Sequence, residues 1–264
     1  MKLTHNQLAE FNKLGYLSLE GLVEKDELNQ ILSSINEIST QNYPGHVLET
    51  HGKSYRAFHG CHLYSPVFNS FIRLSKFLEP ARQILKDAVY LHQLKVNLKA
   101  AYSGEMWPWH QDYIYWKKED QIKNDQILSV MIFLDDIDEF NGPLYFIPGS
   151  HLQGFIDVNK SELSPDGWEG NVSASLSYQV DKSLISSLVK KYGLYSAKGK
   201  KGTVVWFHGN LIHASPSNIS PFTRRILILT YNAVSNAPKD DGIERRPEFL
   251  NGRDRKALNE LEEA

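Results

Sequence analysis

From about residue 89 to residue 233, the sequence consists of short runs rich in β-branched and aromatic residues, separated by turn-forming residues. Runs of this composition are typical of β-strands, and the Gly, Pro, Asn and Ser residues between them predict turns. Many strands with few helices between them predict a double-stranded β-helix, the jelly-roll core that cupins also have. The predicted strands are at 89–100, around 107–116, and at 127–137, 143–150, 202–215 and 224–233.

Helical patterns dominate the residues before this region. Thr4 begins a capping-box sequence, and apolar residues then recur at helical spacing until Gly15. An apolar stripe predicts a second helix at 28–38, and a third is expected at 66–85, interrupted near Pro80. The expected fold class is therefore mainly β with N-terminal helices.

One domain is expected, because 264 residues suit one large core. Its expected parts are a helical N-terminal part at about 1–88 and a jelly-roll core at about 89–235. An insertion at about 157–201 is expected to cover the mouth of the sheet and to contain a helix that ends at Gly193. The tail from residue 251 is expected to form a charged terminal helix or a frayed end.

The overall charge of the chain is small. A formal net charge of -2, from 29 basic and 31 acidic residues, gives no field that would gather nucleic acid or an anionic membrane. The N-terminal sequence lacks the apolar stretch of a signal peptide, and the lone Cys61 suits a reducing compartment. We expect a cytoplasmic monomer or homodimer whose partner is a small molecule, with neither nucleic acid nor a membrane as a partner.

His110, Asp112 and His213 are the candidate metal ligands. Residues two apart on a strand point to the same face, so the first two can reach one ion together, and His213 can add a third ligand from a distant strand. Two imidazoles and one carboxylate with open positions are typical of non-haem Fe(II) oxygenases, whereas a structural zinc site would need a fourth ligand. A His-x-Asp tripeptide alone is a weak signal, because most such histidines are core or surface residues.

Arg224 strengthens the metal hypothesis. It follows His213 after a loop rich in Ser and Pro, and it begins the apolar run RRILILTYNA. In an antiparallel pair joined by that loop, an arginine at the start of the return strand can lie near the ligand histidine. A guanidinium binds a carboxylate through two hydrogen bonds, which suits the far end of a dicarboxylate co-substrate. Arg225 alternates to the opposite face, where it is expected to be solvated.

Several sequence strings resemble a known family. WPWHQDYIYW, FLDDIDEFNGPLYFIPGSH and HASPSNISPFTRR are similar to segments of the phytanoyl-CoA dioxygenase (PhyH) superfamily. The resemblance spans most of the chain and extends to the bacterial branch of trans-4-proline, leucine 5- and ectoine hydroxylases. It implies Fe(II), 2-oxoglutarate and O2 as cofactors and co-substrates. The implied reaction is hydroxylation of an unactivated carbon of a free small amino acid such as proline, leucine or isoleucine, coupled to decarboxylation of 2-oxoglutarate to succinate and CO2.

The resemblance also implies roles for residues at the metal. His110, Asp112 and His213 would bind Fe(II), and Arg224 would bind the distal carboxylate of 2-oxoglutarate. Three further polar residues would assist Arg224: Ser215, Ser129 and Asn97. Related halogenases have a small residue in place of the carboxylate, so the presence of Asp112 indicates hydroxylation.

Five residues are candidates for binding the substrate. Gln93, Lys95 and Trp116 occupy positions that face substrate in the ectoine enzymes, which have an arginine where this chain has Lys95. Arg56 and His59, in YRAFHGCH, resemble a segment of the proline hydroxylase and would hold the substrate carboxylate. For both, a purely structural hydrogen bond is the alternative.

Other functions stay open at this point. The same site could hydroxylate another small molecule or an acyl-CoA, although no basic cluster in the sequence suits the CoA phosphates. A cupin-like metalloenzyme that does not use 2-oxoglutarate could have the same three metal ligands, but it would not need Arg224. A non-catalytic binding protein on the same fold is a third alternative, and it would tolerate replacement of Asp112.

Overall fold

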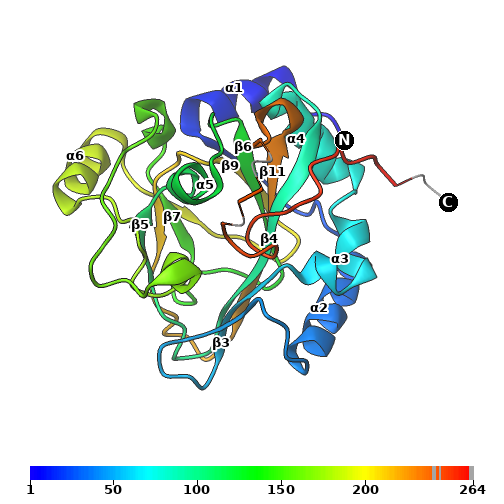
Figure 1. Cartoon of the computed structure of the whole chain (residues 1–264), viewed down its shortest axis with the longest axis horizontal. Helices are drawn as coiled ribbons and strands as arrows, with labels where there is room; N and C mark the ends of the chain where they lie inside the picture. Colours follow the sequence, from blue (N-terminus) through cyan, green and yellow to red (C-terminus); the bar gives the residue numbers. More distant parts are fainter. Residues whose placement is uncertain (240–241, 244, 262–264) are drawn as a thin grey trace.

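Two antiparallel β-sheets form the centre of the fold (Figure 1). The structure, a computed structural model, describes residues 1–239, 242–243 and 245–261. The larger sheet consists, in spatial order, of β1 (Tyr16–Leu19), β9 (Val204–His208), β6 (Ile127–Phe133), β11 (Arg224–Ala233), β4 (Val89–Lys99), β3 (Tyr55–His59) and β2 (His46–Leu48). The smaller sheet consists of β5 (Trp107–His110), β10 (His213–Ser215), β7 (Leu144–Phe146) and β8 (Tyr195–Ala197). This arrangement confirms the predicted jelly-roll class.

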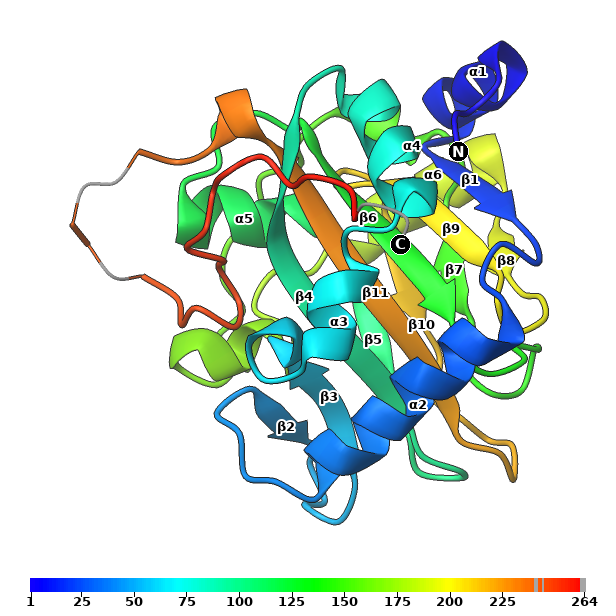
Figure 2. The same ribbon diagram turned by 90° about the vertical axis from the view of Figure 1, so that its right-hand side faces the viewer.

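Helices surround the two sheets, and some of them cover the outer face of the larger one. The helices are α1 (His5–Leu14), α2 (Lys25–Ser39), α3 (Pro66–Phe71), α4 (Ser75–Leu85), α5 (Tyr113–Asp120) and α6 (Lys182–Tyr192). Short 3-10 helices are η1 (Cys61–Leu63), η2 (Ser150–Gln153), η3 (Gly167–Asn171) and η4 (Val234–Asn236). Figure 2 shows α2, α3 and α4 lying across the larger sheet on the side away from the smaller one. The smaller sheet therefore faces the uncovered side of the larger one.

Strand alternation directs two kinds of side chain to the two faces of the larger sheet. On β4, Leu94 and Val96 belong to the main hydrophobic core beneath the helices. Lys95 and Asn97 alternate with them and line a cavity between the sheets. β11 pairs with β4 and places Arg224 opposite Lys99, at the same end of the strands. Polar side chains of β4 and β11 therefore converge in the space between the sheets.

The N-terminal helices agree with the sequence except at one break. The capping box at Thr4 and the left-handed C-cap at Gly15 are both present around α1. The third predicted helix is two helices, and the break lies at Ile72–Leu74, not near Pro80. Pro80 lies within α4, where its neighbours Phe77, Leu78 and Ala81 are fully buried. Packing of this apolar face stabilises the helix despite the hydrogen bond that proline cannot donate.

The prediction for the C-terminal tail is wrong. Residues 251–261 form neither a helix nor a frayed end, because Leu258 is buried, its N–H donates to the Val89 carbonyl and its carbonyl accepts from Arg82. The last three residues of the tail lie outside the described residues. Strand β8 comes from the predicted insertion and joins the smaller sheet. Among the described helices, none has the length and hydropathy needed to cross a membrane.

Candidate active site

His110, Asp112 and His213 converge on one point. His110 ends β5, His213 begins β10, and the two are direct partners in the ladder. Each of the three residues offers one ligand atom, and these atoms lie within 4.8 Å of one another. Asp112 oxygens lie 3.7 Å from Nε2 of His110 and 3.9 Å from Nε2 of His213. Within the described parts of the chain, this is the one such group of His, Cys, Asp and Glu residues.

Contrary to the prediction, Asp112 does not lie on the same strand as His110, although its carboxylate does converge with the two histidines. β5 ends at His110, and Asp112 is the N-cap of α5 with φ −66° and ψ −36°. Gln111 holds this strand-to-helix turn, because its side-chain amide donates to the carbonyls of Gly154 and Asn210. These contacts override the strand propensity of the aromatic residues that follow, which lie on α5. Asp112 therefore reaches the site from a turn and not from a strand.

Backbone carbonyls set the tautomers of both histidines. Nδ1 of His110 lies 2.6 Å from the Pro108 carbonyl, and Nδ1 of His213 lies 2.9 Å from the Leu211 carbonyl. A carbonyl oxygen only accepts, so Nδ1 carries the hydrogen in each ring and Nε2 keeps its lone pair. Both Nε2 atoms face Asp112. This is the arrangement in which outer hydrogen bonds orient histidines toward a metal ion.

The charge states of His213 and Asp112 also suit a divalent cation. Burial lowers the pKa of His213 to about 3, helped by nearby His110, so the ring is neutral. Burial alone would raise the pKa of Asp112, but Lys95 and the two histidines hold it well below its usual range. Oδ2 of Asp112 is buried and has no hydrogen-bond partner among the described residues. An ionised carboxylate with an unpaired oxygen, together with two imidazoles whose Nε2 lone pairs face it, fits Fe(II).

A buried cavity, the Arg224 pocket, extends from this triad between the sheets. Nη2 of Arg224 donates to the Gly142 carbonyl at 2.7 Å and to Oγ of Ser215 at 3.3 Å. Its Nε and Nη1, like Oδ1 of Asn97, are buried and lack a partner in the described structure. Burial lowers the pKa of Arg224 to about 9, so it stays cationic at neutral pH. The residues that line the pocket are Lys95, Asn97, Trp107, His110, Asp112, Leu144, His213, Ala214, Ser215, Arg224, Ile226 and Ile228.

Ser129 does not join Arg224, in contrast to the prediction. Its hydroxyl lies 3.4 Å from the hydroxyl of Thr230, its partner in the β6–β11 ladder. Thr230 lies six residues along β11 from Arg224, which corresponds to about 20 Å. Strand alternation placed Ser129 on the expected face, but the ladder register places it at the other end of the sheet. Ser215 does contact Arg224, and Asn97 lines the same pocket.

A second cavity, the Arg246 chamber, meets the triad from the other side. Four of the five predicted substrate residues line it: His59, Gln93, Lys95 and Trp116. The other lining residues are Trp107, His110, Asp112, Tyr115, Asn171, Val172, Leu176 and Arg246. The triad residues His110 and Asp112 and the side chains of Lys95 and Trp107 border both cavities. The two cavities therefore meet at the candidate metal site.

His59 has the features of a binding residue in this chamber. Both of its ring nitrogens are buried, and neither has a hydrogen-bond partner in the residues that the structure covers. Burial lowers its pKa well below the ordinary range, and the charges of Lys95 and Arg246 add to this effect. A neutral imidazole with one donor and one acceptor unpaired can bind a polar group of a ligand.

Arg246 is a chamber residue that the sequence did not single out. Its guanidinium binds both carboxylate oxygens of Asp120, with Nε donating to Oδ1 at 2.8 Å. Asp120 is the last residue of α5 and also contacts Nε2 of His92 at 3.0 Å. The sequence signal was a pair of arginines before Pro247, beyond the last predicted strand. Such a pair does not reveal which arginine turns inward.

Arg56 lies outside the chamber, so the prediction that it holds the substrate carboxylate is wrong. Its guanidinium binds other parts of the protein, with Nη1 donating to Glu49 at 2.9 Å and Nε donating to the Val172 carbonyl at 2.9 Å. Nη2 donates to the carbonyls of Met106 and Ser173. These contacts direct Arg56 to other segments, and the described residues that line the chamber do not include it.

Comparisons with known proteins identify the family of this chain. The family model for phytanoyl-CoA dioxygenase (PhyH) matches residues 11–226. L-proline trans-4-hydroxylase of Streptomyces griseoviridis is 37% identical over 249 residues, which cover 93% of this chain and 91% of the relative. An ectoine dioxygenase of Sphingopyxis alaskensis is 32% identical over 255 residues, covering 94% of this chain and 82% of the relative.

Solved structures are similar over nearly the whole chain. The crystal structure of EctD from S. alaskensis with 2-oxoglutarate and 5-hydroxyectoine has a TM-score of 0.82 at 29% sequence identity, and the match covers 98% of this chain and 87% of that chain. A crystal structure of EctD from S. alaskensis with bound Fe gives the same TM-score, identity and coverage.

Proposed function

The chain belongs to the phytanoyl-CoA dioxygenase family, and we propose that it hydroxylates an unactivated carbon of a free small amino acid with Fe(II), O2 and 2-oxoglutarate. The reaction decarboxylates 2-oxoglutarate to succinate and CO2. Bound Fe(II) would supply the activation of O2 that this coupled oxidation requires. His110, Asp112 and His213 are the proposed ligands, and each leaves its metal-facing atom available.

The observation that carries the proposal is the meeting of two polar cavities at one triad. The Arg224 pocket offers a buried cation with unpaired donors, which suits the distal carboxylate of 2-oxoglutarate. Asn97 and Ser215 add polar contacts beside it. The Arg246 chamber offers a second cation and the unpaired His59 on the opposite side. Two acids can therefore bind at once, one on each side of the metal ligands.

The Arg246 chamber favours an amino acid as the substrate. Arg246 provides a cation for a carboxylate, and Gln93 and His59 provide neutral hydrogen-bonding groups for the rest of a small polar molecule. Trp107, Tyr115 and Trp116 supply aromatic walls, which limit the size of the ligand and exclude water. The two named relatives are described as acting on L-proline and ectoine, both small molecules.

The proposal is tested by turnover with a defined set of substrates. The protein is loaded with Fe(II) and 2-oxoglutarate without oxygen, and O2 is then added with L-proline, L-leucine, L-isoleucine, L-pipecolate or ectoine. We expect one of these compounds to stimulate succinate release and to gain the mass of one oxygen atom. If none of them stimulates succinate release, the proposed substrate class is wrong. Omission of 2-oxoglutarate tests the alternative of a cupin-like metalloenzyme, which would not depend on it.

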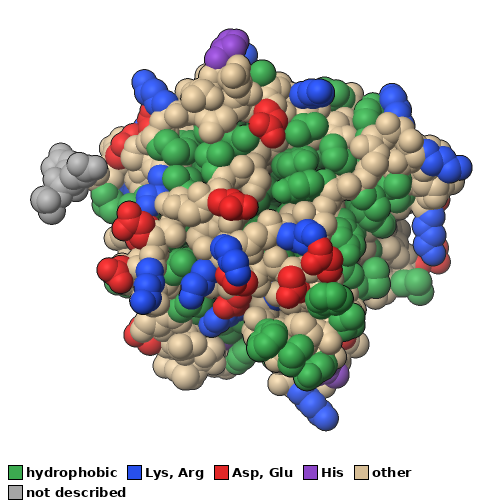
Figure 3. All heavy atoms as spheres, turned by 180° about the vertical axis from the view of Figure 1, so that it is seen from behind, with side chains coloured by type: hydrophobic (Ala, Val, Ile, Leu, Met, Phe, Trp, Pro, Cys, Tyr) green, Lys and Arg blue, Asp and Glu red, His purple; other side chains and the backbone are tan. Residues whose placement is uncertain are grey.

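The cellular setting of the enzyme is part of the proposal. A cytoplasmic enzyme that acts as a monomer or homodimer on a small molecule suits the small net charge of the chain. On the face seen in Figure 3, basic and acidic side chains are interspersed, and no extended basic surface for nucleic acid is present there. Light scattering of the purified protein tests the oligomeric state, and an assembly larger than a dimer would contradict this part of the proposal.

A further inference from the structure

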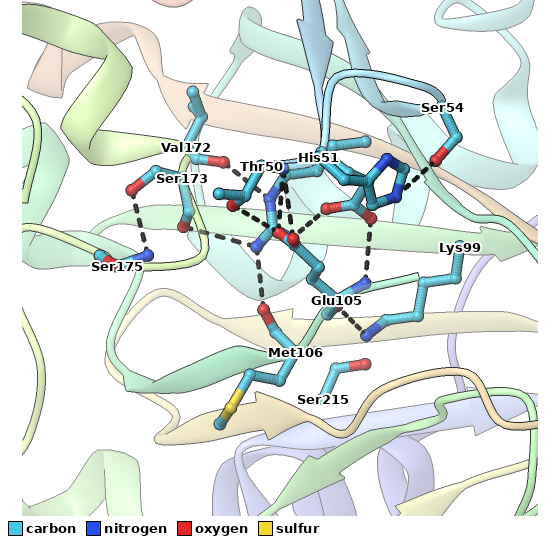
Figure 4. Close-up of polar contacts among 12 residues, drawn as sticks. Thr50, His51, Ser54, Lys99, Glu105, Met106, Val172, Ser173, Ser175 and Ser215 are labelled. Atoms are coloured by element: carbon cyan, nitrogen blue, oxygen red, sulfur yellow. Dashed lines mark hydrogen bonds and ion pairs between the residues drawn. The ribbon is translucent and has the colours of Figure 1, made fainter. Parts of the chain in front are cut away.

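Arg56 joins four separate segments around the two cavities. It lies on β3 and is 1% exposed. Figure 4 shows the carbonyls of Val172, Ser173 and Met106 directed at one guanidinium from two different loops. Glu49, from the loop before β3, supplies the charge partner. The guanidinium therefore connects chain segments that are far apart in sequence.

A β-bulge explains why Arg56 points toward this junction. β2 pairs Val47 with Ala57 but Leu48 with Tyr55, so Arg56 is the extra residue on β3. A bulge redirects a side chain that regular alternation would send to the other face. The side chain is thereby brought over the ring of Trp107, with 3.7 Å between the guanidinium carbon and the ring centroid.

Two of the joined segments form the walls of the Arg246 chamber. Val172 belongs to residues 171–176, the covering segment, which contributes Asn171, Val172 and Leu176 to the chamber lining. Trp107 borders both cavities and begins β5, the strand that ends at His110. Arg56 contacts the covering segment through hydrogen bonds and Trp107 through its ring face. Arg56 thus links the cover directly to the metal strand.

The acidic partners of Arg56 extend the same connection. Glu49 accepts from Nη1 of Arg56 through Oε2 and from the Glu105 N–H through Oε1. The Glu105 carboxylate accepts from the Thr50 hydroxyl at 2.9 Å, and its carbonyl accepts from the Lys99 ammonium at 2.6 Å. Figure 4 shows Glu105 between Thr50 and Lys99. The loop that leads into β5 is therefore fixed to β4 and to the 49–54 loop.

We propose that Arg56 is a positioning residue that holds the covering segment over the substrate and fixes it relative to the metal strand. A planar guanidinium can serve several acceptors in fixed directions, which a lysine ammonium cannot reproduce. Loosening of the cover would admit water and weaken substrate binding, while Arg224 would keep its own contacts with Gly142 and Ser215. Decarboxylation of 2-oxoglutarate would then proceed more often without hydroxylation of the substrate.

The first test is hydrogen exchange of Arg56→Lys, which needs no substrate. We expect faster exchange in the covering segment and at the adjoining Ser177 N–H, which donates to the Gly170 carbonyl. Arg82→Lys is the matched control, because Arg82 also joins a carboxylate, that of Glu79, to a distant carbonyl, that of Leu258. Exchange that is unchanged at 171–177, or that is faster throughout the larger sheet, would overturn the proposal.

The second test is kinetic and rests on the proposed function. The substrate is the panel compound that best stimulates succinate release. Arg56→Lys should raise the KM for this compound by about tenfold or more and leave the KM for 2-oxoglutarate unchanged. The ratio of succinate to hydroxylated product should also rise. Equal effects on both KM values would overturn the proposal.

If Arg56→Lys does not fold, Glu49→Gln weakens the same junction and carries the same expectations. A wild-type protein without turnover would refute the proposed function, while the exchange test would still decide the role of Arg56.

Discussion

His110 and His213 face each other across neighbouring strands, with ring centroids 4.2 Å apart. Burial and the nearby His110 lower the pKa of His213 to about 3, and each of the two rings has its Nδ1 hydrogen directed at a backbone carbonyl. The strand pairing therefore fixes the separation of the two ligands, and the carbonyls fix their orientation. Asp112 completes the set from the turn that follows β5.

Replacement of Arg224 should affect 2-oxoglutarate selectively. Arg224→Gln removes a buried cation and its unpaired donors from the Arg224 pocket, so the KM for 2-oxoglutarate should rise by about 10- to 100-fold. Iron binding should remain, because Arg224 is not a ligand. Arg225→Gln is the control, since Arg225 points to the other face and pairs with Asp135. An unchanged KM in Arg224→Gln would contradict the assigned role.

Loss of the Asp120 carboxylate should weaken the amino-acid site. Asp120→Asn removes the charge partner that orients Arg246 in the chamber, so the KM for the amino acid should rise by about tenfold or more. The KM for 2-oxoglutarate should stay unchanged. Asp157→Asn serves as the control. Asp157 pairs at the surface with Lys118, which lies on α5 as Asp120 does. An equal rise in the KM for the amino acid in both variants would contradict the prediction, because it would show that any lost charge around α5 has this effect and that Arg246 is not its cause.

Acid should destabilise the fold in part through His62. Burial lowers the pKa of His62 to about 4, whereas its ordinary value is 6.5. Between these two pH values the unfolded chain binds a proton that the folded chain does not, so the free energy of unfolding falls as the pH drops from 6.5 to 4 and levels off below. The contribution of this one group is about 3 kcal/mol. His62→Asn should flatten the pH dependence of denaturant unfolding by this amount, and an identical pH profile would contradict the prediction.

The sequence was most informative where chemistry depends on local spacing. His110, Asp112, His213 and Arg224 could be predicted because short strands and one loop bring them together, and the structure places all four around adjoining cavities. The fold class followed from the strand-rich region in the same way. The geometry of Asp112 could not be predicted, because contacts of Gln111 with two distant segments end the strand early.

Other site residues depend on register and on long-range contacts. Ser129 lies on the expected face of the sheet but at the end away from Arg224. Alternation along a strand predicts the face of a residue but not the register of the strand with its neighbours. Arg56 was misassigned because a bulge redirects its side chain. Arg246 was missed because its inward position depends on Asp120, which lies 126 residues earlier in the chain. No local pattern encodes such a pairing.

The most direct measurement of the central claim is a crystal structure of the protein soaked anaerobically with Fe(II) and 2-oxoglutarate. We predict one iron ion bound by Nε2 of His110, Nε2 of His213 and a carboxylate oxygen of Asp112, with the distal carboxylate of 2-oxoglutarate on Arg224. The remaining coordination positions should be free of protein atoms. An ion bound elsewhere, or one closed off by a fourth protein ligand, would contradict the assignment of this site as an oxygenase centre.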